Sequence, residues 1–418
     1  MSSDTPWHVP GKWHAVPAWW EPELQDQLPN LPKEVGLIDC TMAEGPDAVG
    51  CHLSWQSRVE IAEKLDEAGV GAITTPGGCS KQEVIDWIKT VKKRGVKAQI
   101  VNKVVGFRPP LRPGWKEPID KFIDMGGDVF EVHSFWGWSE MVSDFSEGVS
   151  KEQVIDAIGE AIPYAKSKGV HVNYAHGDQL RHRLSTTLSF YKAAIDAGAD
   201  SIYLWDSRGN CNPLAAYHLV SKFKEIAGDR PFYIQFHNDT GMATANSFAA
   251  ATAGATVLDC SVLGIGDRGG CVALEEIACA LEMYGIKTGV KLEKLYELGK
   301  FVEQAFGVET QIWKPIVGRG AFMENGWGHG GPDVPSETFS GIGAEVVGRE
   351  RFKSMLGGNI FSPRHQGFWT DMLDIWGYEF TEKDLDAIKE RTRDAIISRR
   401  GSIEIDEFKV ICEGVLGS

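Results

Sequence analysis

The sequence predicts a TIM-type (β/α)8 barrel, an α/β fold, followed by a smaller and mainly helical C-terminal region. From residue 35 to about residue 288, short apolar runs typical of strands alternate with longer stretches of helical periodicity. Eight such units fill about 250 residues, the usual length of this barrel. Gly-Val pairs such as Gly69-Val70 and Gly169-Val170 mark the points where a helix ends and the next strand begins.

The strand-like and helical runs follow one another in a regular order. The expected strands span residues 35–39, 70–75, 97–105, 128–135, 170–175, 200–205, 231–236 and 256–263. The expected helices span residues 54–69, 80–94, 117–125, 151–168, 185–198, 214–227, 242–254 and 272–284. After residue 288 the alternation stops, and residues 292–306 and 382–397 have the pattern of amphipathic helices. We therefore expect a tryptophan-rich arm at residues 1–34, a barrel domain at 35–288 and a helical region at 289–418.

Composition excludes several classes of protein. The 418 residues carry a net charge of −15, which is unfavourable for binding a phosphate backbone. No apolar run reaches the roughly 18 residues of a membrane span, and the first residues lack a signal peptide's pattern. None of the eight cysteines forms a C-x-x-C pair, and their scatter favours reduced thiols in a cytoplasmic protein. The tryptophan-rich arm and the small C-terminal region both need a further surface to cover their apolar side chains, so we expect a homodimer.

Polar residues gather where the expected strands end, and those ends carry the active site in a TIM barrel. They are the segments Asp39–Glu44, Glu131 with His133, Asp206–Gly209, Gln235–Asp239 and Gly264–Cys271. Period two places Gln235 and His237 on one face of a strand, so both can point into the mouth. A carboxylate from one strand and an imidazole from another are standard ligands for a divalent cation.

Several of these segments also resemble the motifs of one family, the isopropylmalate and homocitrate synthases, in the same order along the chain. The matching segments are Asp39–Gly50, Arg58–Val70, Asp206–Gly209 with Pro213, Phe236–Asn246, Gly264–Arg268 with Ala273–Glu276, and Lys314–Gly318 with Ala321-Phe322. The resemblance covers roughly residues 35–410 and extends to the metal-dependent lyases related to hydroxymethylglutaryl-CoA lyase. It implies a TIM barrel and a divalent metal ion, Mg²⁺, Mn²⁺ or Zn²⁺.

The departures from the family pattern concentrate at the chemical centre. The family's catalytic arginine is replaced by Ala43, its Glu-Gln pair by Pro46-Asp47, the first histidine of H-x-H by Gln235, its metal-associated asparagine by Cys271, and its strand 2 and strand 5 glutamates by Thr74 and a residue near Gly177. The family's arginines on strands 3 and 4 fall on Lys103 and Glu131. The retained positions are Asp39, Glu44, His133, Asp206, His237, Asn238, Asp239 and Arg268.

The resemblance implies a carbon–carbon lyase or synthase that acts on a 2-oxo acid or related carboxylate through an enolate-like intermediate. Glu44 and His237 would hold the metal, with Gln235 or Cys271 as a third ligand. Lys103 would replace the missing cation at the substrate oxygen. The remaining catalytic candidates are His133, His176, His329 and Asp206, and the substrate-binding candidates are Asp39, Glu131, Arg208 and Trp205. A CoA thioester is a possible co-substrate.

Two alternatives remain open at this point. Lys103 in a barrel interior could have a depressed pKa and form a Schiff base without a metal. Pairing with Glu131 on the neighbouring strand would instead keep the lysine protonated. The second alternative is a barrel that has lost catalysis and serves as a ligand-binding protein or a partner subunit, which the changed catalytic positions also fit.

Overall fold

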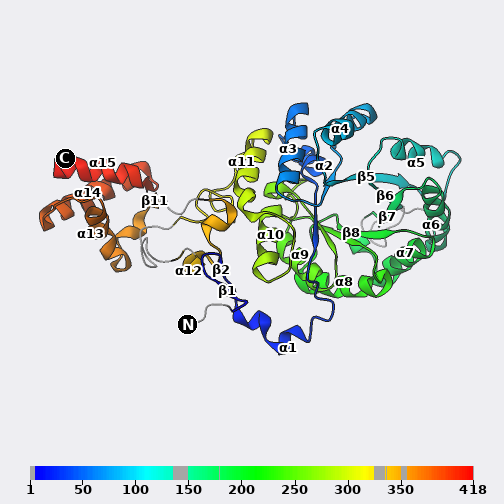
Figure 1. Ribbon diagram of the computed structural model, residues 1–418, viewed down its shortest axis with the longest axis horizontal. Coiled ribbons are helices and arrows are strands. Elements are labelled where there is room, and N and C mark those ends of the chain that lie inside the picture. Colours follow the sequence, from blue (N-terminus) through cyan, green and yellow to red (C-terminus); the bar gives the residue numbers. More distant parts are fainter. Residues whose placement is uncertain are drawn as a thin grey trace. The chain divides into compact units, whose positions relative to one another are not determined.

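Eight parallel strands close into a barrel in the computed structural model of the chain (Figure 1). The structure describes residues 5–134, 149–177, 179–323, 335, 337–349 and 355–417. The barrel strands are β3 (Gly36–Asp39), β4 (Ala72–Thr74), β5 (Gln99–Phe107), β6 (Val129–Ser134), β7 (His171–His176), β8 (Ser201–Asp206), β9 (Phe232–Phe236) and β10 (Val257–Cys260). They pair in chain order, and β10 pairs with β3 to close the ring. The TIM barrel predicted from the sequence is confirmed.

Helices follow the strands along the chain and surround the barrel (Figure 1). They are α3 (Trp55–Glu67), α4 (Lys81–Lys93), α5 (Lys116–Ile123), α6 (Lys151–Lys166), α7 (Leu184–Asp196), α8 (Pro213–Ala227), α9 (Ala243–Thr252) and α10 (Leu274–Met283). Local sequence determines several starts: Ser80 and Ser150 form capping boxes at α4 and α6. Asn212 caps α8, and Pro213 occupies its first turn.

The barrel interior changes from apolar to polar along the strands. One buried cluster consists of Ile38, Ala72, Val101, Val129, Ala175, Tyr203 and Tyr233. Side chains two residues apart on a strand share a face, so Glu131, Gln235 and Asp259 point inward like Val129 and Tyr233. The strand ends therefore enclose ionisable groups that no solvent surrounds.

A second compact unit joins the N-terminal residues to the C-terminal region. Contacts divide the chain into Val16–Glu309 and a unit made of Met1–Ala15 with Thr310–Ser418. In the second unit, α13 (Gln366–Ile375), α14 (Glu382–Arg399) and α15 (Ile405–Leu416) enclose an apolar core. Its short strand pairs are β1 (His8–Val9) with β2 (Trp13–His14) and β11 (Met355–Leu356) with β12 (Ile403–Glu404). These short strands were not predicted from the sequence.

Part of the N-terminal arm covers apolar surface of the barrel unit. The Trp19 indole nitrogen donates to the Tyr284 carbonyl at 3.1 Å, and its ring lies 5.5 Å from that of Phe248. The helix α11 (Leu295–Phe306), which follows the barrel helices, belongs to the same unit. None of the described helices is both long and apolar enough to cross a membrane. The domain limits expected at residues 34 and 288 and the expected homodimer stay predictions.

Replacing a buried and an exposed tryptophan tests the packing of the helices around the barrel. Trp87 on α4 is fully buried, and its indole donates to the Arg58 carbonyl at 3.2 Å. Trp87→Ala leaves a large cavity, so we expect the barrel unit to lose about 3–5 kcal/mol of unfolding free energy. Trp313 is 83% exposed, so Trp313→Ala should change stability by less than about 0.5 kcal/mol. Urea denaturation followed by circular dichroism measures both, and equal losses would contradict the assigned packing.

Candidate active site

Glu44 lies at the end of a short helical turn that directly follows the first barrel strand. The turn is α2 (Thr41–Glu44). The buried Asp39 carboxylate accepts from the Thr41 amide at 3.0 Å and from the Thr41 hydroxyl at 2.7 Å. That hydroxyl in turn accepts from the Val262 amide at 2.8 Å. Asp39 therefore holds the turn that carries Glu44 against the segment after β10, and its predicted role in substrate binding stays a prediction.

His237 and Cys271 come from two loops that pair with each other. They form an isolated antiparallel bridge, and the Asn238 amide donates to the Gly270 carbonyl at 2.8 Å. The loop needs its glycines: a Cβ on Gly266 would lie 2.6 Å from the Cys271 sulfur, and one on Gly270 would lie 2.0 Å from the Gly264 carbonyl oxygen. The glycine-rich sequence thus permits the close approach that brings the thiol beside the imidazole.

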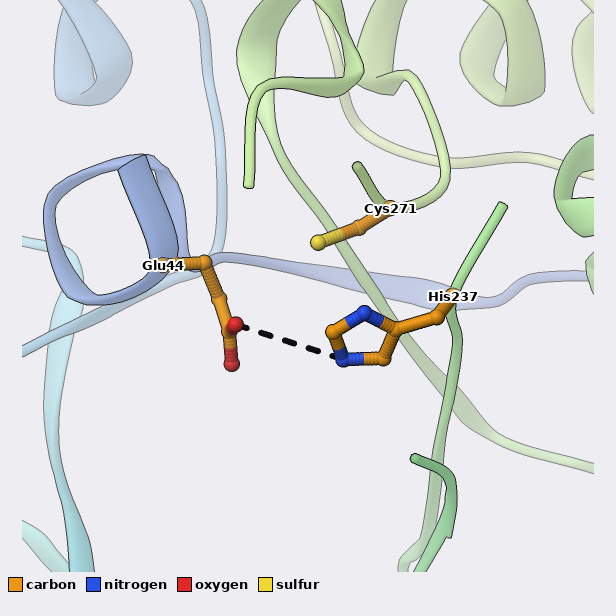
Figure 2. A group of neighbouring side chains, drawn as sticks. All are labelled: Glu44, His237 and Cys271. Carbon is orange, nitrogen blue, oxygen red and sulfur yellow. Dashed lines mark ion pairs between the residues drawn. The ribbon is translucent and has the colours of Figure 1, made fainter. Parts of the chain in front are cut away.

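Glu44, His237 and Cys271 converge on one point (Figure 2). Their candidate ligand atoms all lie within 4.8 Å of one another. The His237 Nε2 atom is 4.0 Å from Glu44 Oε2. Burial lowers the pKa of His237 although Glu44 opposes this effect, so the imidazole is neutral and has a lone pair for a metal ion. These three residues are members of the metal set predicted from the sequence; the metal role itself stays a prediction.

Lys103 reaches the cluster from β5 and lies between two carboxylates. Its ammonium nitrogen is 2.9 Å from Glu44 Oε1 and 3.3 Å from Asp259 Oδ2. Tyr203 also donates to Asp259 through its hydroxyl group. Burial alone would lower the pKa of Lys103, but Asp259 and Glu44 outweigh it and raise that pKa well above the usual value. Burial alone would raise the pKa of Glu44, but Lys103 and His237 hold it at about 2.

These ion pairs correct one expectation from the sequence. Pairing of Lys103 with Glu131 on the neighbouring strand is one of the two alternatives left open by the sequence, whereas the ammonium bonds Glu44 and Asp259. The register of β5 with β6 shifts between Asn102 and Val105. Lys103 itself keeps the alternation, because it lies two residues after Val101 of the interior cluster and points into the barrel. Among the described residues, no side chain hydrogen-bonds either oxygen of Glu131, and burial raises its pKa well above the usual value.

Gln235 lies beside the cluster but presents its amide nitrogen to it. Its Nε2 donates to Glu44 Oε1 at 3.5 Å and to the Cys40 sulfur at 3.4 Å. A metal-ligand role would need the amide oxygen on that side. The geometry as it stands fits a residue that orients Glu44.

The other candidates are placed as follows. Burial lowers the pKa of His133 to about 4, and its ring lies 5.2 Å from that of Trp205 inside the barrel. The Asp206 carboxylate accepts from the Cys211 amide at 2.9 Å and so closes the loop after β8. His176 bonds Ser134 and packs on Phe190 of α7, so it lies between the barrel wall and a helix, away from the cluster. His329 lies outside the described residues.

A cavity of about 350 Å³ opens above the cluster. Its lining includes Glu44, Lys103, Trp205, Arg208, Gln235 and His237. Three cationic side chains, those of Lys103, Arg208 and Arg268, thus share one space with the Trp205 indole and with Glu44 and His237. Its size suits a small organic acid.

Three residues of the site were not anticipated from the sequence. Asp259 pairs with Lys103, the Tyr203 hydroxyl donates to Asp259, and Cys40 lies beside Gln235. A signal for Asp259 exists in the sequence, because a carboxylate interrupts an otherwise apolar strand, and a charge buried there needs a partner. No comparable signal marks Tyr203 or Cys40.

Comparison with known proteins gives a consistent result. The family model HMGL-like matches residues 34–302. A 2-isopropylmalate synthase of Methanocaldococcus jannaschii is 32% identical over 390 residues, which are 93% of this chain and 73% of that protein. Homocitrate synthase AksA of Methanopyrus kandleri is 30% identical over 393 residues, 93% of this chain and 94% of that one. An HMG-CoA lyase of Bacillus subtilis has a similar fold, with a TM-score of 0.55 and 18% identity over 67% of this chain and 96% of that one.

The pH dependence of stability tests the environment of Asp39. Burial raises the pKa of this carboxyl to about 7 despite the hydrogen bonds from Thr41. In the unfolded chain the value is about 3.9, so between these values the native state holds a proton that the unfolded chain has released. The unfolding free energy contributed by Asp39 therefore falls as the pH rises through that window. The Asp39→Asn side chain cannot ionise. As the pH rises through this window, the unfolding free energy of the variant should therefore fall less than that of the wild type, by about 1.4 kcal/mol per pKa unit spanned.

Urea unfolding at about pH 5 and about pH 8 measures this difference. Asp196→Asn is the matched control, because its carboxylate is exposed and pairs with Lys192; it should keep the wild-type pH dependence. The same pH dependence in the wild type and Asp39→Asn would refute the assignment.

Proposed function

Because this chain belongs to the HMGL-like family, we propose that it forms or cleaves a carbon–carbon bond in a small 2-oxo acid or related carboxylate. The observation that carries the proposal is the convergence of Glu44, His237 and Cys271, of which Glu44 and His237 line the barrel-mouth cavity. A divalent metal ion is the proposed cofactor. A CoA thioester as co-substrate stays a prediction that the assay below includes.

The donor set fits a divalent cation. A carboxylate, a neutral imidazole and a thiol offer one oxygen, one nitrogen and one sulfur from three different segments. Three protein ligands leave a coordination position open, as in catalytic metal sites. A bound ion of this kind polarises a carbonyl oxygen and stabilises the negative charge that develops there.

Lys103 supplies a second positive charge beside the same space. The family's arginine is replaced by Ala43, which lines the cavity and carries no charge. The Lys103 ammonium also lines the cavity and is held in place by Glu44 and Asp259. A preorganised cation in a site of low dielectric constant stabilises an oxyanion without reorganisation. We assign that role to Lys103, and we assign Arg208 to binding of the substrate carboxylate at the mouth.

The ion pairs argue against a Schiff base at Lys103. A nucleophilic lysine must lose its proton, whereas two carboxylates raise the pKa of this one. His133 is the better candidate for accepting a proton, because burial keeps its imidazole neutral. The neighbouring Trp205 lines the cavity, which places His133 next to its wall.

Replacing His237 tests the metal-dependent reaction. His237→Ala removes the imidazole ligand, so we expect loss of bound metal and at least about a hundredfold loss of turnover. Elemental analysis measures the metal. Mass spectrometry follows products from a panel of 2-oxo acids, each with and without acetyl-CoA. His218→Ala is the control because His218 is exposed on α8, and it should retain both properties. Full metal content and turnover in His237→Ala would refute the proposal, and an inactive wild type would favour the non-catalytic alternative.

Replacing Lys103 tests the second cation. Lys103→Met keeps an unbranched side chain without the charge, and turnover should fall by about 10²–10³-fold. Lys103→Arg should retain more activity. The loss of one charge leaves Asp259 buried without its ammonium partner, which costs about 3–5 kcal/mol of stability. The double variant with Asp259→Asn should therefore restore stability but not turnover.

Lys166→Met is the control for removing a lysine from an ion pair, since Lys166 bonds Asp200 at 2.7 Å away from the cluster. It should keep wild-type turnover. Equal activity of Lys103→Met and the wild type would remove Lys103 from the mechanism.

A further inference from the structure

We propose that the cluster is a thiolate metal site that selects a zinc-type ion over Mg²⁺, with Cys271 as the sulfur ligand and Cys40 as the residue that positions that sulfur. This inference rests on the metal ion of the proposed function and specifies its chemical class. It also assigns a role to Cys40, a buried residue that lies beside the cluster.

The backbone around Cys271 is shaped to bring its sulfur to the cluster. The bridge between His237 and Cys271 places their side chains together. Gly266 leaves the room that the sulfur occupies, since any Cβ there would lie 2.6 Å from it. Cys271 is 2% exposed, so its thiol faces the protein interior and not bulk water. Nothing in barrel packing alone requires such a loop around one thiol.

Glu44 has one oxygen available for a metal ion. Its Oε1 atom accepts from Lys103 at 2.9 Å and from Gln235 at 3.5 Å. Its Oε2 atom is the one that faces His237, at 4.0 Å. The cluster therefore offers a single carboxylate oxygen together with nitrogen and sulfur. Mg²⁺ requires an octahedral shell of oxygen atoms, whereas Zn²⁺ binds four ligands drawn from cysteine, histidine and carboxylate groups.

Cys40 lies next to the cluster in the protein interior. Its sulfur accepts from Gln235 Nε2 at 3.4 Å, and the Cys271 thiol is a close neighbour of its own thiol. Cys40 is fully buried at the end of β3. Groups that hydrogen-bond a metal ligand orient it and tune its basicity. Gln235 and Cys40 thus hold the Cys271 sulfur in place. In this proposal Gln235 also orients Glu44 and is not a metal ligand.

Cobalt(II) is the probe for the thiolate. Metal-free full-length protein titrated with Co²⁺ should develop a sulfur-to-cobalt charge-transfer band in the near ultraviolet. Cys271→Ser should lose this band and bind Co²⁺ and Zn²⁺ at least about 100-fold more weakly. Millimolar Mg²⁺ should not displace Co²⁺ from the wild type. Cys279→Ser is the matched control, because Cys279 is a buried free thiol on α10 outside the cluster, and it should behave as the wild type.

Two further variants separate ligation from folding. Cys40→Ala should shift the charge-transfer band and weaken Zn²⁺ binding by about 10–100-fold, and Cys40→Ser, which keeps a donor, should restore most of it. Cys271→Asp replaces sulfur by oxygen and should raise the affinity for Mg²⁺ relative to Zn²⁺. Circular dichroism identifies any variant that fails to fold, and the remaining one still decides the question.

The inference is overturned if Co²⁺ binds without the band, if Cys271→Ser binds Zn²⁺ like the wild type, or if Mg²⁺ competes at equal concentration. Those outcomes leave the metal-dependent reaction standing as long as His237→Ala loses its metal. Retention of metal by both His237→Ala and Cys271→Ser would refute the site and the proposed function together.

Discussion

The ammonium group of Lys103 between two buried carboxylates is the interaction on which the rest of the site depends. Only 9% of this side chain and none of Asp259 is exposed, so neither charge has water to solvate it. A buried charge without a partner costs several kcal/mol, which makes the pair conditional on accurate geometry. That geometry requires β5, β10 and the turn α2 to meet at one end of the barrel. The pair therefore links the closure of the barrel to the position of Glu44, which Lys103 also holds.

Polar side chains occupy positions in the barrel interior that apolar side chains would pack more favourably. Glu131 and Asn173 are opposed on β6 and β7, both are fully buried, and no side-chain oxygen or nitrogen of either has a hydrogen-bond partner in the described part of the chain. An apolar pair at these positions would stabilise the barrel more. Burial raises the pKa of Glu131 well above the usual value. Polar groups are thus kept in the interior at the expense of stability, as expected near a functional site.

Strong periodicity made the barrel predictable, whereas contacts across it were not. Each barrel strand and helix buries an apolar face, and that pattern is visible in the sequence. The four-residue turn α2 has no period of its own and depends on the carboxylate of Asp39. The partners of Lys103, Glu44 and Asp259, come from distant segments of the chain, and no local signal announces these contacts. His176 is different: strand alternation already places it on the face opposite Ala175, which belongs to the interior cluster, so its position was predictable.

The exchange of an arginine for Ala43 changes more than the position of a charge. An arginine next to Glu44 in the sequence would bring its own cation to the mouth, independent of the opposite wall. Lys103 instead comes from β5 and bonds the same carboxylate that faces His237. Its charge opposes a second cation at Glu44 while it fixes the orientation of that carboxylate. Under the proposed function, Lys103 therefore affects both the binding of a metal ion at Glu44 and the stabilisation of a substrate oxyanion. The proposed zinc-type ion would offset the repulsion by Lys103, because a thiolate ligand at Cys271 adds affinity for a softer ion.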